Sequence, residues 1–360
     1  MAKIVYGVSG EGSGHSSRAR EILRYLLAQG HEVRVVSYDR GYRNLKDDFD
    51  VTEVAGLKIV SKNNKVSPLI TLLENLRSVP DGIKSFRRVR KTLFKQFAPD
   101  CVITDFEPTT AYLANYYGLP LITIDNQHRM RYMTYEFEEQ HRKDAIVTEA
   151  IIRAMVPRPT VSLITSFHEG ELRNNTSYVF PPILRSEVLA LKPEPGANIL
   201  VYVTSGYESL LSTLAGFTRE QFVVYGYNKG ERHGNLLYKS FSSDGFLEDL
   251  RRAKAVVATA GFTLMTESLY LGVPMFALPM KGQFEQILNA SMLDKLGYGA
   301  TGDGTRDLAA FLYQLPDYRV ALSSYPRLGN EQITTFLGKL LQDDCRYLRE
   351  IYTQPDLAVQ

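Results

Sequence analysis

The sequence predicts an α/β protein made of two doubly wound domains, each built around a parallel sheet. Short apolar runs rich in β-branched residues alternate with segments of helical period, as in successive βαβ units. One such series fills the N-terminal half, and a second begins near Asn198. The length of 360 residues suits two domains of ordinary size better than one core. We expect an N-terminal domain over residues 1–180, a linker over 181–196, a C-terminal domain over 197–335 and a terminal helix over 336–360.

Composition narrows the class of protein and of partner. Apolar residues make up 44% of the chain and charged residues 23%, as in globular proteins. The 42 basic and 40 acidic residues leave a net charge of +2, so we expect no nucleic-acid partner. Cys101 and Cys345 form neither a disulfide framework nor a zinc motif, which favours a reducing compartment. Without a signal-peptide pattern or an apolar run of about 18 residues, we expect a cytoplasmic protein that is soluble or lies on a membrane.

The chain opens with a βαβ motif that contains a glycine-rich turn. We expect a strand over 3–8, the turn over 9–18, a helix over 19–29 and a strand over 31–37. The glycines of the turn are Gly10, Gly12 and Gly14, whereas a dinucleotide fingerprint needs Gly-x-Gly-x-x-Gly. This mismatch disfavours a dehydrogenase, even though Asp39 stands where a ribose-binding carboxylate is expected.

His15 follows Gly14 at the entrance of the first helix, at the carboxyl edge of the predicted sheet, where open α/β proteins bind ligands. A neutral imidazole can take a proton from a hydroxyl group near pH 7, so we expect His15 to be a general base. The alternative is that His15 caps or packs at the turn, or binds a phosphate passively.

Two further predicted strands end in acidic residues at the same edge. They cover 100–104 and 119–124 and are followed by Asp105 and Asp125. Asp105 is the candidate to hold the imidazole in its useful tautomer, although a helix cap is the competing interpretation. Glu107 is the reserve for this role, and Glu107 and His128 are candidates to contact an acceptor.

The rest of the N-terminal half is less informative. We expect helices over 68–79, 81–97 and 129–156, a strand over 161–165, and the start of the crossing to the second domain over 178–183. The helix over 81–97 has one apolar face and many basic residues, so it is either an ordinary crossover helix or one that rests on an anionic membrane surface. Asp48-Phe-Asp50 resembles a metal motif but follows no buried strand, so we expect no metal site.

The second half repeats the alternation of strands and helices. We expect strands over 198–203, 221–225, 238–241, 255–258 and 275–278, and a helix from Asn330 onward. The turn after the first of these strands contains Ser205 and Gly206, and it offers backbone N–H groups to a pyrophosphate.

Gly261 turns the chain from a buried strand into a helix that begins near Thr263. The first N–H groups of a helix have no partner and its dipole favours negative charge, so this turn suits a phosphate. Thr263 can cap the helix or bond a phosphate oxygen. Glu267 lies one turn further on the same face, where a carboxylate suits a neutral diol such as a ribose. Together these residues indicate a nucleotide sugar.

The next helix begins near Glu285 and Gln286 and carries Asn289 on the same face as Gln286. Carboxylate and amide groups suit the hydroxyls of a sugar, because amides both donate and accept hydrogen bonds.

These motifs resemble the donor-binding signature of two-domain, metal-independent nucleotide-sugar glycosyltransferases of the GT-B fold. The family includes the lipid-linked N-acetylglucosaminyltransferase of peptidoglycan synthesis and the plant and antibiotic sugar transferases. The matching residues are Gly261 with Glu267, Gly272-Val-Pro274, Glu285-Gln286 and Asn289-Ala290. A second resemblance lies in the loop Gly10-Glu-Gly-Ser-Gly-His15, followed by Arg18-Ala19. It is similar to the glycine-rich loop of the peptidoglycan enzyme and to that of prokaryotic glycosyltransferase-like proteins. Glu285 replaces the usual Asp, and Thr259 replaces a phosphate-binding His of the plant enzymes.

The resemblance implies two facing Rossmann-like domains, with the terminal helix crossing back to the first. It implies that the N-terminal domain supplies the base His15 and the acceptor contacts. Glu267 is expected to hold the ribose, and Glu285 with Gln286 the donor sugar. The nucleobase is expected beside the loop from Phe241 to Phe246. Gly14 and Gly206 are also expected to contact the donor.

The function so implied is an inverting, metal-independent transfer of a sugar from a nucleoside diphosphate sugar to an acceptor hydroxyl. A UDP-sugar is the expected donor, with no further cofactor. A glycan, a lipid or a small molecule is the expected acceptor, with a lipid-linked or envelope glycan preferred and a place on the inner face of the cell membrane allowed. The alternatives are a nucleotide-sugar 2-epimerase and a non-catalytic protein that binds a nucleotide sugar or a lipid.

Overall fold

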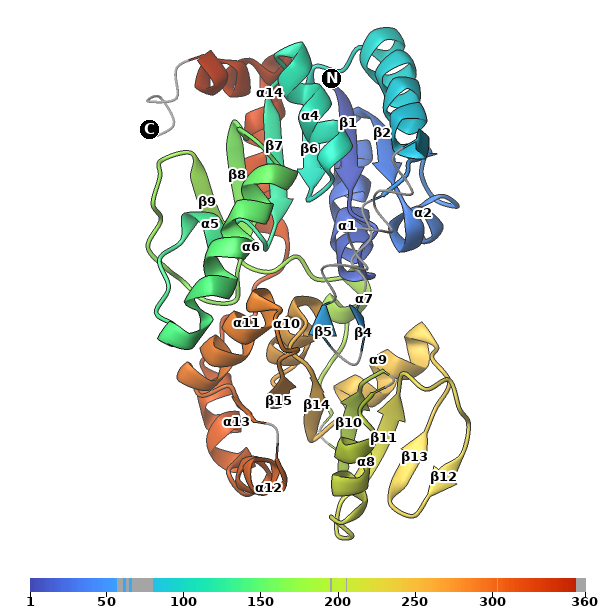
Figure 1. Ribbon diagram of the computed structural model, residues 1–360, viewed down its shortest axis with the longest axis vertical. Coiled ribbons are helices and arrows are strands. Elements are labelled where there is room, and N and C mark those ends of the chain that lie inside the picture. Colours follow the sequence, from blue (N-terminus) through green and yellow to red (C-terminus); the bar gives the residue numbers. More distant parts are fainter. Residues whose placement is uncertain are drawn as a thin grey trace. The chain divides into compact units, whose positions relative to one another are not determined.

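The computed structural model describes residues 1–56, 61–62, 65–66, 80–194, 196–204, 206–302 and 304–353. These residues form two compact units, each with one seven-stranded sheet (Figure 1). Of the described residues, the first unit holds those up to Arg185, apart from 61–62 and 65, and those from Gly329 onward. The second unit holds residues 61–62 and 65 and the described residues of 186–328. The predicted α/β class with two largely parallel sheets is confirmed.

The first unit is built on a fully parallel sheet. Its strands are β1 (Lys3–Val8), β2 (Glu32–Ser37), β3 (Val51–Glu53), β6 (Cys101–Asp105), β7 (Leu121–Asp125), β8 (Val161–Thr165) and β9 (Ser177–Phe180), in the order β3-β2-β1-β6-β7-β8-β9. Every residue of β6, β7 and β8 is buried, as expected for strands covered by helices on both faces. The helices are α1 (Gly14–Ala28), α2 (Asp39–Leu45), η1 (Arg90–Phe97), α4 (Pro108–Tyr117), α5 (Arg129–Tyr132), η2 (Glu139–His141) and α6 (Arg142–Met155).

The second unit repeats this plan with one antiparallel edge. Its strands are β10 (Asn198–Tyr202), β11 (Gln221–Tyr225), β12 (Arg232–His233), β13 (Leu236–Tyr238), β14 (Ala255–Thr259), β15 (Met275–Leu278) and β16 (Gly299–Thr301), in the order β12-β13-β11-β10-β14-β15-β16. Only β12 pairs antiparallel within this sheet. Its helices are α7 (Ser186–Leu189), α8 (Glu208–Ala215), α9 (Ser243–Arg251), α10 (Phe262–Tyr270), α11 (Phe284–Lys295), α12 (Thr305–Tyr313) and α13 (Leu315–Ser323). The short strands β4 (Ser61–Lys62) and β5 (Lys65–Val66) form a separate pair.

The last helix, α14 (Glu331–Thr353), belongs to the core of the first unit. Its buried side chains join one apolar cluster with those of β1 and α1; they are Ile333, Leu337, Leu340, Leu341, Cys345, Leu348 and Ile351. The return to the first unit starts at Gly329, earlier than the expected residue 336. The sulfur atoms of Cys345 and Cys101 on β6 lie 3.7 Å apart, and both thiols are free.

α1 begins earlier than the sequence predicts. The expected start was Ala19, but the carbonyl of Ser13 already accepts a hydrogen bond from Ser17 N at 3.0 Å, so helical bonding starts inside the glycine-rich turn. His15 therefore lies on the first turn of the helix and Arg18 at the start of the second, which fixes the direction of their side chains.

The predicted long helix over 129–156 is broken into α5 and α6. The chain leaves the helix after Tyr132 because it pairs with the segment before β9. Thr134 N donates to Glu171 O at 2.9 Å, and Arg173 N donates to Tyr132 O at 2.8 Å. This pairing of distant segments overrides the local helical pattern.

Other predicted elements differ in part. Residues 178–183 do not begin a crossing, because Ser177–Phe180 add a strand to the sheet as β9. The strand expected over 238–241 is β13, which ends at Tyr238. The helix expected over 81–97 is present as residues 81–89 and η1, but two members of its expected apolar face, Ile83 and Phe86, are exposed. The helix expected over 68–79 lies outside the described residues.

The packing of α14 predicts that this helix stabilises the first unit. Leu340→Ala should lower the free energy of unfolding by about 2–5 kcal/mol, because a fully buried leucine leaves a cavity when it is truncated. Denaturant unfolding of the whole chain measures the change. Lys339→Ala, an exposed neighbour on the same helix, is the matched control and should change stability by less than about 0.5 kcal/mol. Equal effects of the two substitutions would contradict the packing.

Candidate functional site

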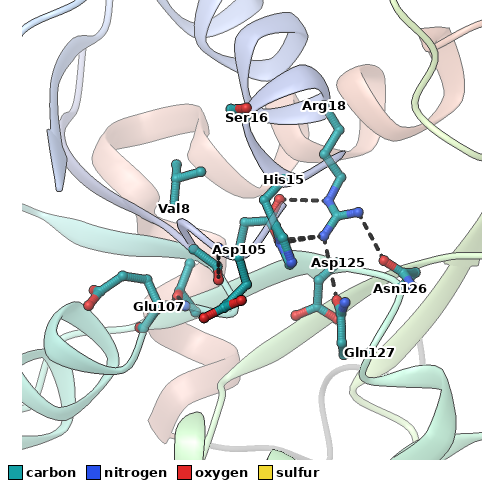
Figure 2. A network of polar contacts seen from close by, with 12 residues as sticks. Val8, His15, Ser16, Arg18, Asp105, Glu107, Asp125, Asn126 and Gln127 are labelled. Atoms are coloured by element: carbon teal, nitrogen blue, oxygen red, sulfur yellow. Dashed lines mark hydrogen bonds and ion pairs between the residues drawn. The ribbon is translucent and has the colours of Figure 1, made fainter. Parts of the chain in front are cut away.

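Three neighbouring strands of the first sheet end at one edge in polar residues. β1, β6 and β7 are adjacent and parallel, so their carboxyl ends lie side by side. α1 starts shortly after β1, Asp105 is the last residue of β6, and Asp125 is the last residue of β7. Figure 2 shows the network of side chains at this edge.

His15 is the second residue of α1 and is 8% exposed. Its Nδ1 lies 2.6 Å from Oδ1 of Asp105. The structure thus brings together the imidazole and the carboxylate that the sequence offered as a base and its supporting group. A histidine held by a carboxylate at a strand end is an arrangement that acid–base chemistry uses.

Asp105 is fully buried, and its two oxygens are held by Arg18. Nε of Arg18 donates to Oδ2 at 2.6 Å, and Nη2 donates to Oδ1 at 2.6 Å. The next residue, Phe106, has φ of 57°, so the chain reverses sharply after the carboxylate. Asp105 caps no helix, because the N-cap of α4 is Glu107. The capping alternative for Asp105 is therefore wrong.

Arg18 was named in the sequence only as part of the loop motif, with no role assigned to its side chain. Besides Asp105 it contacts Asn126 Oδ1 from Nη1 at 2.9 Å and Gln127 Oε1 from Nη2 at 3.5 Å. Burial acts to lower the pKa of Arg18, but the Asp105 carboxylate outweighs it and the pKa is raised. The available signal was its spacing of three residues from His15, which puts both side chains on one face of a helix.

Glu107 caps α4 and does not face an acceptor, which corrects the prediction. Its carboxylate accepts hydrogen bonds from Thr109 N at 2.8 Å and from Thr110 N and Oγ1 at 2.7 Å each. Burial raises the pKa of Glu107, although these bonds oppose the shift. A Cβ on Gly7 of β1 would lie 2.0 Å from Thr110 Oγ1, so this glycine lets the capped helix approach the strand.

His128 is also withdrawn from the predicted acceptor contact. It is fully buried, its Nδ1 lies 2.7 Å from Asp125 Oδ2, and its backbone N donates to Asp125 Oδ1 at 2.8 Å. Burial acts to raise the pKa of Asp125, but His128 and Arg18 outweigh it and the pKa is lowered. The pair fixes the turn after β7, which carries Asn126 and Gln127.

In the second unit, Gly261 is the N-cap of α10. Its φ of −70° and ψ of 136° are open to any residue, so the backbone does not require glycine here. A Cβ at this position would meet nothing within 4 Å. The space beside the N-cap is therefore open, and Thr263, the second residue of the helix, is not its cap. The prediction that Thr263 caps the helix is wrong.

Glu267 on α10 is 2% exposed, so it is not the solvated glutamate that a surface helix normally carries. Glu285 is partly exposed in the first turn of α11. Gln286 and Asn289 have internal partners. Gln286 accepts from Met280 N at 3.1 Å and donates to Gln283 Oε1 at 2.7 Å, and Asn289, fully buried, donates to Ala260 O at 2.8 Å. Both amides thus hold the loops around the donor residues. Asn289 has no exposed surface for a sugar, whereas contact of Gln286 with the sugar stays a prediction.

The region expected beside the nucleobase is partly core. Phe246 lies in α9, is buried, and packs edge to face on Tyr202 and Tyr225, so only Phe241, 54% exposed, belongs to the loop. Gly206 has φ of 96°, a left-handed conformation that favours glycine. Ser205 lies outside the described residues, and Gly14 is the first residue of α1.

In the part of the chain that the structure describes, no three His, Cys, Asp or Glu side chains are grouped as metal ligands. No helix among those residues has the length and apolarity needed to cross a membrane.

The known proteins to which this chain is similar include several glycosyltransferases. Residues 2–316 match the family described as Glycosyl transferase family 1. An uncharacterized glycosyltransferase of Methanosarcina mazei is 26% identical over 332 residues, which cover 82% of this chain and 84% of the relative. The structure of MurG from Acinetobacter baumannii has a TM-score of 0.60 at 17% identity and covers 94% of this chain and 100% of that one. The Streptomyces glycosyltransferase SsfS6, complexed with thymidine diphosphate, has a TM-score of 0.60 at 15% identity, with coverage of 94% and 100%.

The contacts of Glu107 predict a purely structural role. Glu107→Ala should lower the free energy of unfolding by about 1–2 kcal/mol, because the first N–H groups of α4 lose their acceptor. Thermal and urea unfolding measure the change, and Glu139→Ala, an exposed glutamate, serves as the control. An unchanged stability of the Glu107 variant would remove the capping role.

Proposed function

The chain belongs to glycosyl transferase family 1, and we propose that it moves a sugar from a nucleoside diphosphate sugar to an acceptor hydroxyl by an inverting, metal-independent reaction. Family membership makes the protein a glycosyltransferase, so transfer takes precedence over the epimerase and the non-catalytic binding protein. The observation that carries the mechanism is the contact of 2.6 Å between His15 Nδ1 and Asp105 Oδ1.

His15 is the proposed base. When Nδ1–H donates to Asp105, the lone pair of the imidazole is on Nε2. This nitrogen takes the proton of the acceptor hydroxyl as the oxygen attacks the anomeric carbon. The bond from that carbon to the diphosphate breaks on the opposite face, and the diphosphate leaves with the electron pair. Asp105 stabilises the imidazolium that forms.

The donor is the proposed ligand of the second unit. The start of α10 at Gly261, where a Cβ would meet nothing within 4 Å, turns the positive end of a helix dipole to the departing diphosphate, in place of a metal ion. The thymidine diphosphate bound to SsfS6 supports a nucleoside diphosphate as the ligand. A UDP-sugar remains the proposed donor, and thermal-shift measurements with uridine, thymidine and guanosine diphosphate sugars compare the three bases.

The acceptor is proposed to be a lipid-linked or envelope glycan, on the resemblance to the peptidoglycan enzyme. On the same ground we propose that the chain works at the inner face of the cell membrane. Transfer assays with a glycan, a lipid-linked glycan and small aglycones separate these acceptors, and preference for a small aglycone would contradict the proposal.

Replacement of Gly261 tests the donor site. Gly261→Ala should weaken donor binding by about tenfold or more, because its methyl group would fill the open space at the start of α10 that the diphosphate is proposed to enter. The free energy of unfolding should change by less than about 1 kcal/mol. Calorimetry of nucleoside diphosphate binding measures the first effect. Gly230→Ala, whose Cβ also meets nothing within 4 Å, is the control, and unchanged affinity in Gly261→Ala would contradict this site.

Replacement of His15 tests the base. His15→Ala should reduce kcat by about 10²–10⁴-fold and leave the Kd of the donor within about twofold, because the imidazole acts on the acceptor. His233→Ala, an exposed histidine at the edge of the second sheet, is the control. A variant that keeps most of its turnover would exclude His15 as the base.

The same assays test the rest of the scheme. Transfer by the unaltered protein should persist in EDTA, and loss of activity there would contradict the metal-free step. The coupling constant of the anomeric proton, measured by NMR in donor and product, should change from one configuration to the other. Retention would contradict direct displacement.

A further inference from the structure

The proposed mechanism leaves Arg18 without a role, although its guanidinium is central to the network in Figure 2. The side chain is 6% exposed and touches both members of the proposed His15–Asp105 pair. Burying an arginine and an aspartate is costly, and a buried ion pair is weak evidence for stability as such. The geometry of the contacts therefore needs a reason other than stability.

Nδ1 of His15 can make only one hydrogen bond in the plane of the ring, but two groups lie close enough to be its partner. It lies 2.6 Å from Asp105 Oδ1 and 2.8 Å from Arg18 Nη2. If Nδ1 carries the proton, it donates to Asp105 and Nε2 can act as a base. If Arg18 donates to Nδ1, the proton sits on Nε2 and the base is lost. The choice between the tautomers depends on where the hydrogens of Nη2 go.

Acceptors around the guanidinium favour the first arrangement. Asp105 Oδ1 accepts from Nη2 at 2.6 Å, and Gln127 Oε1 lies 3.5 Å from the same nitrogen. Asn126 Oδ1 accepts from Nη1 at 2.9 Å. The hydrogens of Arg18 thus have oxygen acceptors other than the imidazole, and the guanidinium holds the carboxylate at both oxygens.

Charge gives Arg18 a second effect on the imidazole. A lone carboxylate beside His15 would favour the imidazolium, which is not a base. The positive charge of Arg18, 2.8 Å from Nδ1, offsets the negative charge of Asp105, 2.6 Å from the same nitrogen. The other ionisable groups at this edge are Tyr6 of β1, whose pKa is raised by burial and by Asp105, Asp125 of β7, which is paired with His128, and Glu107, which caps α4.

We propose that Arg18 is the positioning residue of the transfer reaction: it fixes the Asp105 carboxylate and offsets its charge, so that the lone pair of the His15 imidazole lies on Nε2. The proposal rests on the proposed function of His15 as the base. Arg18 touches neither donor nor acceptor in this scheme, and it acts through Asp105 and His15.

The test compares Arg18→Gln and Arg18→Lys with the unaltered protein over pH 6 to 8. Arg18→Gln removes the charge, so kcat/KM should fall about tenfold more at pH 6 than at pH 8, because more His15 is protonated at the lower pH. Arg18→Lys keeps the charge but loses the two-point hold, so kcat should fall by a similar factor at both pH values. Arg24→Gln, an exposed arginine on the same helix, is the control and should match the unaltered protein.

A purely structural role predicts another outcome. If Arg18→Gln lowers activity equally at every pH, or if Arg18→Lys shows the steeper loss at pH 6, the proposal is overturned. Circular dichroism checks that each variant folds. If Arg18→Gln does not fold, the pH dependence of Arg18→Lys still tests the proposal.

A measurement without substrate separates this inference from the proposed function. The ring protons of His15 are followed by NMR through the same pH range, with His15→Gln for assignment. Protonation of His15 should persist to higher pH in Arg18→Gln than in the unaltered protein. An unchanged titration would overturn the role of Arg18 even if transfer is observed, and a shifted titration without any transfer would leave the effect of Arg18 standing while the proposed function fails.

Discussion

The pairing of the buried Asp105 carboxylate with Arg18 is the interaction on which the rest of the first unit's site depends. A carboxylate without water must be paired and hydrogen-bonded, or it costs several kcal/mol. Arg18 meets this demand with two bonds, and His15 lies against the same oxygen. The local backbone is consistent with this role. β6 ends at Asp105, the chain turns at Phe106, and Glu107 rather than Asp105 caps α4. The carboxylate is therefore left to hold the imidazole.

The repeated parallel sheet explains why chemistry gathers at strand ends in both units. In the first, the ends of β1, β6 and β7 collect the imidazole, the carboxylate and the amides that hold Arg18. In the second, β14 leads through Gly261 into α10, whose open N-terminus is suited to a diphosphate. The resemblance to GT-B glycosyltransferases is confirmed by the family match and by the fold shared with MurG. The proposed base and the proposed diphosphate site thus belong to different units of the chain.

Strands and strand ends could be predicted from the sequence, whereas the partners of polar side chains could not. Apolar β-branched runs mark a buried strand locally, which is why β1, β8, β11 and β15 have the predicted bounds. Parallel pairing puts the carboxyl ends of neighbouring strands at one edge of the sheet. The contact between His15 and Asp105 could therefore be predicted. Glu107 and Asn289 are residue types that often contact ligands, but in this chain they are buried and hydrogen-bond to its own backbone groups. Arg18 was missed because its meaning depends on residues about 90 to 110 positions away in the chain.

The proposed reaction depends on the position of one proton, and nitrogen NMR of histidine-labelled protein near neutral pH, without substrate, locates it most directly. We expect Nδ1 of His15 to carry the proton, directed at Asp105, and Nε2 to have the chemical shift of an unprotonated nitrogen. A proton on Nε2, with Nδ1 accepting from Arg18, would contradict it, because that imidazole has no lone pair to offer an acceptor hydroxyl.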